Sequence, residues 1–381
     1  MDFTTQCIHG NKAEAVHSTG SISVPIFQTA TFSHPGVGQS TGYDYSRVQN
    51  PTREHLERTL AALEMGIDAL AFSTGMAALA TLMELFSPGD HIIVSDDLYG
   101  GTHRLFSCIS NKNGISFSLV NTSDSSLILS YIKPETKAIF IETPSNPLMQ
   151  VTDIAAVSCI TKQHKLLLIV DNTFLTPYFQ KPLNLGADIV IHSGTKYLGG
   201  HNDTLAGFLV TSDPDLSGRL RYIYKTTGAC LSPFDSWLLI RSIKTLAFRL
   251  EKQQQNAIQI ARWLSSHRKI TALHYAGLPS HPGYLVSIRQ STGFGAMISF
   301  ETDNADTARQ ILERVSLIQY AESLGGVETL ITYPMLQTHA DVPENERETK
   351  GINDRLLRLS VGLEAADDLI FDLEHAMEDE L

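Results

Sequence analysis

Residues 189–203, IVIHSGTKYLGGHND, give the strongest indication of the fold, because an apolar run rich in β-branched residues stops abruptly at small and hydroxylated residues. Such a run is typical of a buried strand in a mostly parallel sheet. Lys196 lies just past its end, where open α/β sheets bind their ligands. Taken alone, Lys196 is more simply a solvated strand-end lysine than a reactive amine, so the surrounding segments must decide between the two.

Six further apolar runs alternate with amphipathic stretches of helical spacing. This alternation predicts βα units and an α/β fold with a mostly parallel, seven-stranded sheet in a large domain. The additional strands are expected at DALAFS (68–73), HIIVSD (91–96), FSLVN (117–121), KAIFIET (137–143), LLLIVD (166–171) and AGFLVT (206–211).

The two ends of the chain do not follow this alternation. Residues 1–52, rich in Gly, Pro, Ser and Thr from residue 20 onward, are expected to form an extended arm that contacts a neighbouring subunit. A long helical pattern over 237–267 precedes a smaller mixed segment. We therefore predict an arm over 1–52, a cofactor-binding large domain over 53–235 and a smaller α+β C-terminal domain over 236–381.

Composition limits the classes of function. The chain has 381 residues, 43% hydrophobic and 18% charged, with a formal net charge of −12. The sequence has no cluster of Lys and Arg of the kind that binds the phosphate backbone of nucleic acids, so no nucleic-acid partner is expected. The first residues lack a basic head and an apolar run, and no stretch of about 18 apolar residues occurs. We expect a cytoplasmic protein that does not bind a membrane.

The four cysteines, Cys7, Cys108, Cys159 and Cys230, lie far apart and form no C-x-x-C pair. This spacing favours reduced thiols over a disulfide framework or a zinc site. We expect each cysteine to have a structural role in the core, and we expect no metal.

Several predicted strands end in polar residues that a structural loop would not need. The turn in AFSTGMAAL brings the backbone N–H groups of Gly75 and Met76 to a helix start, where they could hold a phosphate. Tyr99 stands beside two glycines, and Asn146 lies in a proline-flanked turn. Asp171 follows five apolar residues, where a carboxylate needs a cation unless it serves as a buried cap or turn former.

One cofactor explains these groups together. A phosphate site, an aromatic ring for stacking, a buried carboxylate and a reactive lysine are what a pyridoxal phosphate (PLP) enzyme needs. Lys196 would form the Schiff base, and Asp171 would keep the pyridine nitrogen protonated. The hydroxyls of Ser193 and Thr195 would bind the phosphate.

Eight segments, in order along the chain, resemble the Cys/Met-metabolism family of PLP enzymes, the group of cystathionine γ-synthase and cystathionine γ-lyase. They are YDYSRVQNPTR, FSTGMAA, DDLYGGTHR, ETPSNP, VDNTF, HSGTKYLGGH, AESLGGVETL and RLSVGLE. The resemblance implies a PLP-dependent transferase fold of the aspartate-aminotransferase type. It also implies a homotetramer, a dimer of dimers with shared active sites, that acts on small amino-acid substrates.

The resemblance also implies roles for single residues. Lys196 would be the Schiff-base lysine, Asp171 the pyridinium partner, and Tyr99 the stacking residue that also serves in acid/base steps. Phosphate contacts would come from Gly75, Met76, Ser193 and Thr195, and from Tyr45 and Arg47 of the partner subunit.

For the substrate, Arg358 would bind the α-carboxylate through its bidentate fork. Ser323 would support it, and Asn146 would lie near the phenolic oxygen of the cofactor.

Further positions bear on the reaction. Methionine γ-lyases carry a cysteine where this chain has Gly101, and Glu322 matches the glutamate typical of members that act at Cγ. The stretches FDSWLL, GGHND and ITYPMLQTHADVP resemble synthases that use O-acetylhomoserine. These features favour γ-replacement, in which cysteine and an O-acylhomoserine give cystathionine, with sulfide as a further acceptor in some relatives. The alternative is a cystathionine γ-lyase or a β/γ-lyase.

Asp44 and Arg104 are candidates for binding the distal amino and carboxylate groups of cysteine or cystathionine. A surface salt bridge explains the two residues equally well.

Three rival readings have less support. Residues 38–42 match the G-x-S-x-G of serine hydrolases, but neither a strand before nor a helix after them is expected. Gly36, Gly38 and Gly42 do not form a nicotinamide fingerprint. A non-catalytic relative of the fold is disfavoured, because Lys196 and its proposed companions are all present.

Overall fold

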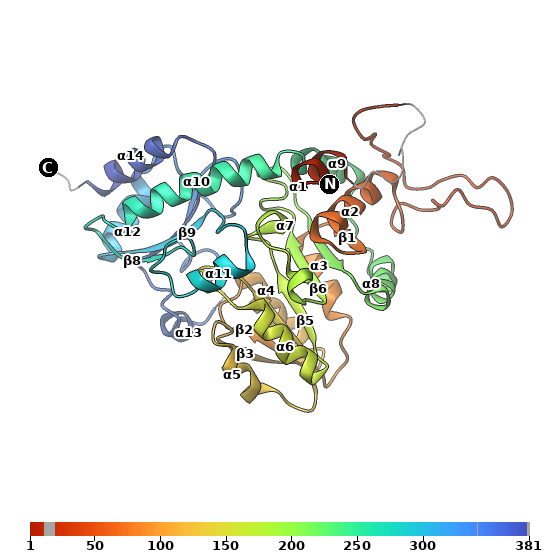
Figure 1. Ribbon diagram of the computed structural model, residues 1–381, viewed down its shortest axis with the longest axis horizontal. Helices are drawn as coiled ribbons and strands as arrows, with labels where there is room; N and C mark the ends of the chain where they lie inside the picture. The colour runs from red at the N-terminus through yellow and green to blue at the C-terminus, as the bar shows by residue number, and fades with distance from the viewer. Residues whose placement is uncertain (11–19, 341, 379–381) are drawn as a thin grey trace.

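The computed structural model describes residues 1–10, 20–340 and 342–378. Two sheets lie side by side, joined by the long helix α10 (Leu246–Leu264), and a loop from the N-terminal part of the chain extends away from both (Figure 1). Residues 11–19, which belong to the predicted arm, and Asp341 in the ITYPMLQTHADVP stretch lie outside the described residues.

The larger sheet has seven strands in the order β1-β7-β6-β5-β4-β2-β3. All strand pairs are parallel except those of β7, which runs antiparallel to both β1 and β6. All seven strands predicted from the apolar runs are therefore confirmed, and the sheet is mostly parallel. The strands are β1 (Asp68–Phe72), β2 (His91–Ser95), β3 (Ser116–Val120), β4 (Thr136–Glu142), β5 (Leu167–Asp171), β6 (Ile189–Ser193) and β7 (Gly207–Thr211).

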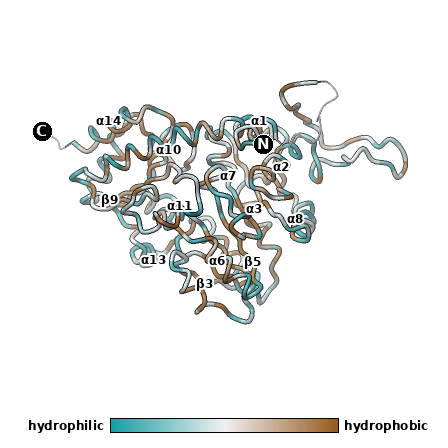
Figure 2. The backbone as a smooth tube through the Cα atoms, in the orientation of Figure 1, coloured by the Kyte–Doolittle hydropathy of each residue, from teal (hydrophilic) through white to brown (hydrophobic). Residues whose placement is uncertain are grey.

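Helices cover both faces of this sheet, because successive strand residues point to opposite sides and are apolar on each. On β4, Ile139 and Ile141 join the core that includes Val157 of α6, whereas Phe140 joins the core that includes Leu79 of α3. Hydrophobic residues accordingly run through the interior, and the outer helix α8 is mostly hydrophilic (Figure 2). The helices of this part of the chain are α2 (Pro51–Glu64), α3 (Gly75–Met83), α4 (Gly100–Arg104), η1 (Leu105–Ser110), α5 (Ser125–Ile128), η2 (Leu129–Tyr131), α6 (Ile154–His164), α7 (Thr176–Phe179), η3 (Pro182–Leu185), α8 (Pro214–Thr227) and α9 (Pro233–Ile243).

The smaller sheet has the order β10-β11-β12-β9-β8 and is antiparallel except for the β10–β11 pair. It brings β12, with Arg358, toward the larger sheet. Its elements are β8 (Ile270–His274), α11 (Tyr284–Gln290), β9 (Met297–Thr302), α12 (Ala305–Arg314), β10 (Gln319–Tyr320), β11 (Leu330–Thr332), α13 (Glu344–Thr349), β12 (Leu356–Ser360) and α14 (Ala366–Met377).

The helical pattern over 237–267 does not form one helix, because α9 ends at Ile243 and α10 begins at Leu246. At the break, the Thr245 hydroxyl donates to the Ser242 carbonyl (3.1 Å), and Arg249 donates to the same carbonyl (3.0 Å). Side chains thus satisfy the carbonyl that a continuous helix would have used.

The N-terminal residues only partly follow the prediction of an extended arm. Residues 3–9 form α1 (Phe3–His9), capped by the Asp2 side chain and carrying the buried Cys7, so the first turn of chain packs on the body. Residues 20–49 do extend away from it (Figure 1), and the backbones of Thr31 and Tyr45 pair across this loop. Residues 38–42 lie there without a flanking strand or helix, which removes the support for a nucleophile elbow.

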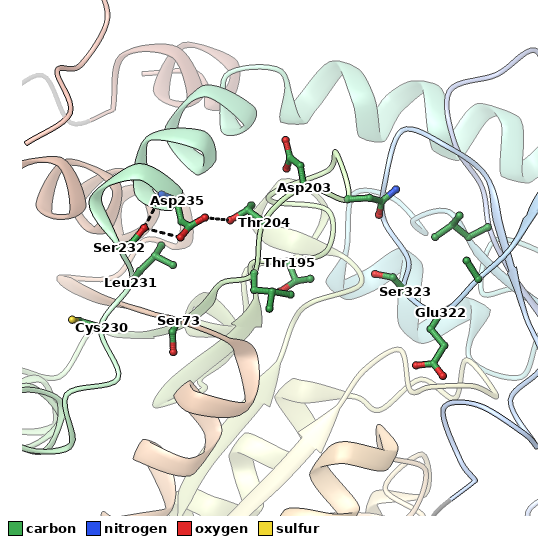
Figure 3. Close-up of a pocket in the computed structure, with 14 residues that line it drawn as sticks. Ser73, Thr195, Asp203, Thr204, Cys230, Leu231, Ser232, Asp235, Glu322 and Ser323 are labelled. Atoms are coloured by element: carbon green, nitrogen blue, oxygen red, sulfur yellow. Dashed lines mark hydrogen bonds between the residues drawn. The ribbon is translucent and has the colours of Figure 1, made fainter. Parts of the chain in front are cut away.

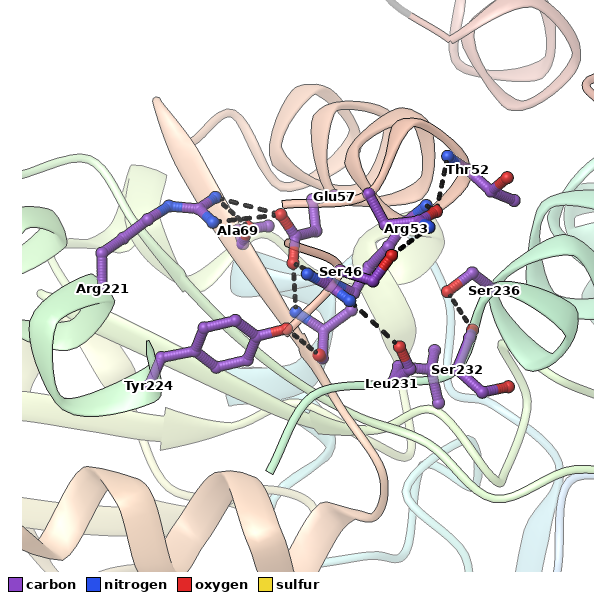
Figure 4. Close-up of polar contacts among 12 residues, drawn as sticks. Ser46, Thr52, Arg53, Glu57, Ala69, Arg221, Tyr224, Leu231, Ser232 and Ser236 are labelled. Atoms are coloured by element: carbon purple, nitrogen blue, oxygen red, sulfur yellow. Dashed lines mark hydrogen bonds and ion pairs between the residues drawn. The ribbon is translucent and has the colours of Figure 1, made fainter. Parts of the chain in front are cut away.

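A buried polar network anchors α2 to the edge of the larger sheet (Figure 4). Glu57 of α2 accepts hydrogen bonds from the Ala71 amide of β1 (2.9 Å) and from Arg221 of α8 (3.1 Å). The Tyr224 hydroxyl donates to the Ala71 carbonyl (2.8 Å), and Arg53 donates to the Leu231 carbonyl (3.3 Å). This network fixes the carboxyl end of β1, which precedes the turn into α3.

All four cysteines are free thiols, as expected from their spacing. Their burial differs from the prediction, because Cys7 is buried whereas Cys108 and Cys159 are exposed and Cys230 is half-buried. Burial raises the pKa of the Cys7 thiol to about 12, so this thiol is unreactive at neutral pH. Within the described residues, no helix is both long and apolar enough to cross a bilayer.

Candidate active site

The carboxyl ends of the parallel strands β4, β5 and β6 meet at one edge of the larger sheet. A cavity of about 370 Å³ opens there and is closed on its other side by residues of the smaller sheet and its loops. The cavity brings together the following predicted residues: Gly75, Met76, Tyr99, Asn146, Asp171, Ser193, Thr195, Lys196, Glu322, Ser323 and Arg358.

Lys196 lies in the turn that follows β6, and its Nζ donates to the Ser323 hydroxyl (2.9 Å). Burial and the positive charge of Arg358 lower the pKa of the Lys196 ammonium to about 8, while Glu322 opposes the shift. The loop carrying Ser323 approaches closely because Gly325 (φ +78°) has no side chain, and a Cβ there would stand 2.6 Å from the Tyr197 nitrogen.

Asp171 ends β5 and accepts a hydrogen bond from the Thr173 amide (2.9 Å). Burial raises the pKa of its carboxyl, and hydrogen bonds from Thr173 and the charge of His192 oppose that rise. A cation in the cavity would favour the ionised carboxylate. The position therefore suits a counter-ion to a positively charged ligand.

The first turn of α3 supplies an anion site at the opposite end of the cavity. The Thr74 side chain caps the helix by accepting from the Ala77 amide (2.9 Å), and the amides of Gly75 and Met76 have no intrahelical acceptor at these positions. A Cβ on Gly75 would stand 3.2 Å from the Ser193 hydroxyl oxygen. Two backbone donors and a hydroxyl group thus converge where a phosphate would fit.

Arg358 of β12 is buried and held by three acceptors. Its Nη1 donates to Asn146 Oδ1 (2.8 Å), and its Nη2 donates to the Ser323 carbonyl (3.0 Å) and to the Thr332 hydroxyl (3.1 Å). Its Nε is buried without an acceptor in the described part of the chain. Burial lowers the pKa of this guanidinium to about 10, so it remains a cation that can bind a carboxylate.

Tyr99 follows β2 and keeps 42% of its surface exposed toward the cavity region. Its amide donates to Glu142 Oε2 (3.1 Å). A Cβ on Gly101 would stand 2.5 Å from the Tyr99 ring, so the ring in this position requires glycine at residue 101. Gly101 therefore has a steric role here besides its value for distinguishing family members.

A second, outer cavity of about 770 Å³ adjoins the first and shares Thr195, Leu205, Glu322 and Ser323 with it. Figure 3 shows Glu322 and Ser323 on one side of this cavity and Ser73, Cys230 and Ser232 on the other. The exposed Glu322 carboxylate therefore stands at the junction of the two cavities.

The remaining predicted residues are not brought to either cavity by this chain. Asp44 accepts from the Ser40 hydroxyl (2.6 Å) within the extended loop, and Arg104 lies exposed at the end of α4. Arg47 lies over the Tyr45 ring and donates to the Lys225 carbonyl.

The family model for Cys/Met metabolism PLP-dependent enzymes matches residues 4–378. The chain belongs to this family. It is 48% identical over 374 residues to the cystathionine β-lyase of Lactococcus lactis subsp. cremoris, covering 98% of each chain. It is 49% identical over 368 residues to the cystathionine γ-synthase/O-acetylhomoserine (thiol)-lyase of Bacillus subtilis, covering 97% of this chain and 94% of the relative.

Among solved structures, the chain resembles cystathionine γ-lyase from Lactobacillus plantarum complexed with L-serine. The TM-score is 0.95 at 47% sequence identity, covering 99% of this chain and 98% of the other. The PLP-dependent transferase fold expected from the sequence is thereby confirmed, and the cofactor of the family is pyridoxal phosphate. The similar proteins have different activities, so membership of the family leaves the reaction to be proposed.

The residues present fit this cofactor. The α3 amides and Ser193 suit its phosphate, the buried Asp171 suits a protonated ring nitrogen, and Lys196 is the amine within the same cavity. We propose these roles for them, with Tyr99 beside the ring and Asn146 near its phenolic oxygen.

The cavity lining also includes residues that the sequence analysis did not assign to the site, among them Glu142, Thr173 and Thr338. Glu142 ends the apolar run of β4 as Asp171 ends that of β5, so the sequence carries the same signal, a carboxylate directly after a buried strand, at both positions. Thr338 comes from a loop of the C-terminal part of the chain, and no local pattern connects it to the strand ends.

The lowered pKa of Lys196 predicts how the protein freed of PLP takes the cofactor up again. Because only the free amine attacks the aldehyde, the uptake rate should rise with pH with a midpoint near 8, instead of near the ordinary value of 10.5. Stopped-flow absorbance after mixing with PLP measures this rate. Arg358→Met removes a positive charge and should move the midpoint upward; a wild-type midpoint above 10 would contradict the proposed environment.

Proposed function

We propose that this enzyme catalyses γ-replacement on an O-acylhomoserine, with cysteine as the acceptor and cystathionine as the product. The Cγ–O bond breaks and the acyl group leaves as a carboxylate. A Cγ–S bond forms, and the thiol proton is released. The proposal includes sulfide as a second acceptor, as in an O-acetylhomoserine thiolyase.

The observation that carries this proposal is the junction of the two cavities at Glu322. A replacement reaction must accommodate two amino acids at once, and we assign the donor to the inner cavity of about 370 Å³, beside the cofactor. The outer cavity then receives the acceptor, with the Glu322 carboxylate between the two. The resemblance of Glu322 to the glutamate of members acting at Cγ supports the same placement.

The chain's own residues orient the substrate and move protons. Bound PLP supplies the electron sink that stabilises negative charge at the substrate Cα. Arg358 binds the α-carboxylate through its buried Nε and one Nη, and Asn146 and Thr332 fix the guanidinium plane. Lys196, whose ammonium has a pKa near 8, moves protons between Cα and the neighbouring carbons, and Tyr99 assists in these acid/base steps.

The second candidate is a cystathionine lyase, because the same two cavities would hold cystathionine itself. Proteins named cystathionine β-lyase and cystathionine γ-lyase are about as similar to this chain as the synthase is. A lyase would release cysteine, 2-oxobutanoate and ammonia by γ-cleavage, or homocysteine, pyruvate and ammonia by β-cleavage.

Steady-state assays of the purified holoenzyme discriminate between these activities. Cystathionine formation from O-acetylhomoserine and cysteine should be faster than cleavage of cystathionine supplied alone. A cleavage rate well above the synthesis rate would contradict the proposal and favour the lyase, with the keto acid identifying Cβ or Cγ. A protein that neither absorbs in the visible with PLP nor turns over would indicate a non-catalytic relative.

We further propose a homotetramer in which the extended loop of one subunit completes the site of another. In the described part of the chain, Tyr45 is 45% exposed, Arg47 contacts the Tyr45 ring and α8, and neither residue lines the inner cavity. Both would then reach the phosphate end of the partner's cavity. Asp44 of the same loop would bind a distal group of the substrate, and we propose Arg104 for the opposite charge.

Mixing experiments test the shared site. An Arg47→Ala chain and a Lys196→Ala chain should each give nearly inactive homo-oligomers, because every site lacks one of the two residues. Their hybrids should regain activity, since one site of each mixed pair has both Arg47 and Lys196. Activity is assayed after exchange of differently tagged chains, with hybrids isolated by tandem affinity. Verified hybrids that remain inactive would place both residues in one subunit's site.

A further inference from the structure

Glu142 is a buried acid at the cofactor cavity to which the proposed reaction gives no role. It ends β4, stands beside Asp171 in the parallel register, and is only 6% exposed. Its Oε2 accepts from the Tyr99 amide (3.1 Å), the one hydrogen-bond donor to this carboxyl in the described part of the chain. Glu142 therefore lies beside Asp171 on the neighbouring strand and also binds the backbone of Tyr99.

The surroundings of Glu142 are poor in compensating positive charge. Asp171 stands on the next strand, and Asp97, which accepts from the Leu148 amide (3.2 Å), lies on the other side near Asp96. Three cationic side chains act on this group of acids. Arg358 also donates to Asn146 and to the Ser323 carbonyl, Lys350 donates to the Asp96 carbonyl, and His192 acts on Asp171. Two or three adjacent buried carboxylates cannot all remain ionised there.

Burial and the neighbouring Asp171 raise the pKa of the Glu142 carboxyl well above its usual range, although the Tyr99 amide and Arg358 oppose the shift. Burial also raises the pKa of Asp97 to about 6. Asp171 differs from Glu142 because it receives hydrogen bonds from Thr173 and the influence of His192. The negative charge therefore belongs on Asp171, opposite the proposed pyridinium.

We propose that Glu142 is a positioning residue that works as an uncharged carboxylic acid, holding the Tyr99 amide while leaving Asp171 as the anion that faces the cofactor. This inference rests on the proposed placement of Tyr99 and Asp171 at PLP, but not on which reaction the enzyme performs. Glu142 acts through these two residues and not on the substrate.

Glu142→Gln and Glu142→Ala test this proposal with two readouts, the visible absorption of bound PLP between pH 6 and 9 and steady-state kinetics. The glutamine variant keeps an uncharged acceptor for the Tyr99 amide, so its absorption band should match the wild type and its kcat should stay within about threefold. The alanine variant loses that contact, so its band should shift and its kcat/KM should fall by about 10- to 100-fold.

Glu364→Ala provides the matched control, because Glu364 also accepts a backbone hydrogen bond (Thr329 amide, 2.7 Å) but lies in the smaller sheet region away from the cavity. It should change the melting temperature without moving the absorption band. If Glu142→Ala does not fold, Glu142→Asp, whose shorter carboxyl falls short of the Tyr99 amide, replaces it.

Either of two results would overturn the proposal. A glutamine variant as impaired as the alanine variant, with a displaced pH transition in its spectrum, would mean that Glu142 acts as an anion. An alanine variant that, like Glu364→Ala, changes only the melting temperature would reduce Glu142 to a structural residue. Because the absorption band needs no substrate, both results can be read even if the proposed γ-replacement is wrong.

Discussion

Replacement of Lys196 by alanine is expected to abolish turnover while leaving the fold intact. The change removes both the amine that holds the cofactor and the base that moves protons between the substrate carbons. Loss of a positioned acid/base group alone lowers a rate by about 100- to 10,000-fold, so the combined loss should leave activity at the detection limit. Steady-state rates at saturating PLP measure the effect, and circular dichroism checks the fold.

Lys252→Ala is the matched control, since Lys252 is exposed on α10, away from the cavity. It should retain the wild-type rate. A Lys196→Ala variant with a near-normal rate would contradict the mechanism, because no other lysine lines the described inner cavity.

Replacement of Arg358 by alanine is expected to raise the KM for the amino-acid donor by about 100-fold or more. The guanidinium is buried, its Nε has no acceptor, and a carboxylate bound there would gain a pair of charge-assisted hydrogen bonds worth about 3 kcal/mol. The KM of Arg358→Lys should lie between those of the wild type and Arg358→Ala, because an ammonium keeps the positive charge but loses the bidentate geometry of the guanidinium. Initial rates over a range of O-acetylhomoserine concentrations provide the measurement.

Arg355→Ala provides the comparison on the same strand region. Arg355 pairs with Glu301 (3.1 Å) and its side chain is 38% exposed, so its loss should leave the KM unchanged. The visible absorption of bound PLP verifies that the cavity of each variant is formed. An Arg358→Ala variant whose KM is normal while its kcat falls would remove Arg358 from carboxylate binding.

Most of the larger sheet could be predicted from the sequence, because its inner strands are buried on both faces and therefore read as continuous apolar runs, whereas the edge strand β3 is largely exposed. Asp171 could be recognised for the same reason, because a carboxylate directly after a buried apolar strand needs a cation or a capping role to offset its burial. Glu142, within the motif ETPSNP, has the same signature. The role of Glu142 cannot be recognised from its own segment, because only the β4–β5 register shows that Glu142 and Asp171 lie side by side.

Other parts of the site depend on contacts that no local pattern encodes. Thr338 and Arg358 reach the cavity from the smaller sheet region, far along the chain from Lys196. The break between α9 and α10 depends on the side chains of Thr245 and Arg249 binding the Ser242 carbonyl, within a sequence whose periodicity continues across it. The extended loop (residues 20–49) is proposed to reach the cavity of a second subunit, and the local sequence pattern of one chain does not encode a contact between subunits.

Chemical trapping shows whether Lys196 is the amine that carries the cofactor. The holoenzyme is reduced with borohydride, digested, and mapped by mass spectrometry for the peptide that bears the reduced pyridoxyl phosphate group. We expect the label on Lys196 in the wild type and no trapped cofactor in Lys196→Ala. A label on any other lysine of the wild type, or unchanged labelling of the variant, would contradict it.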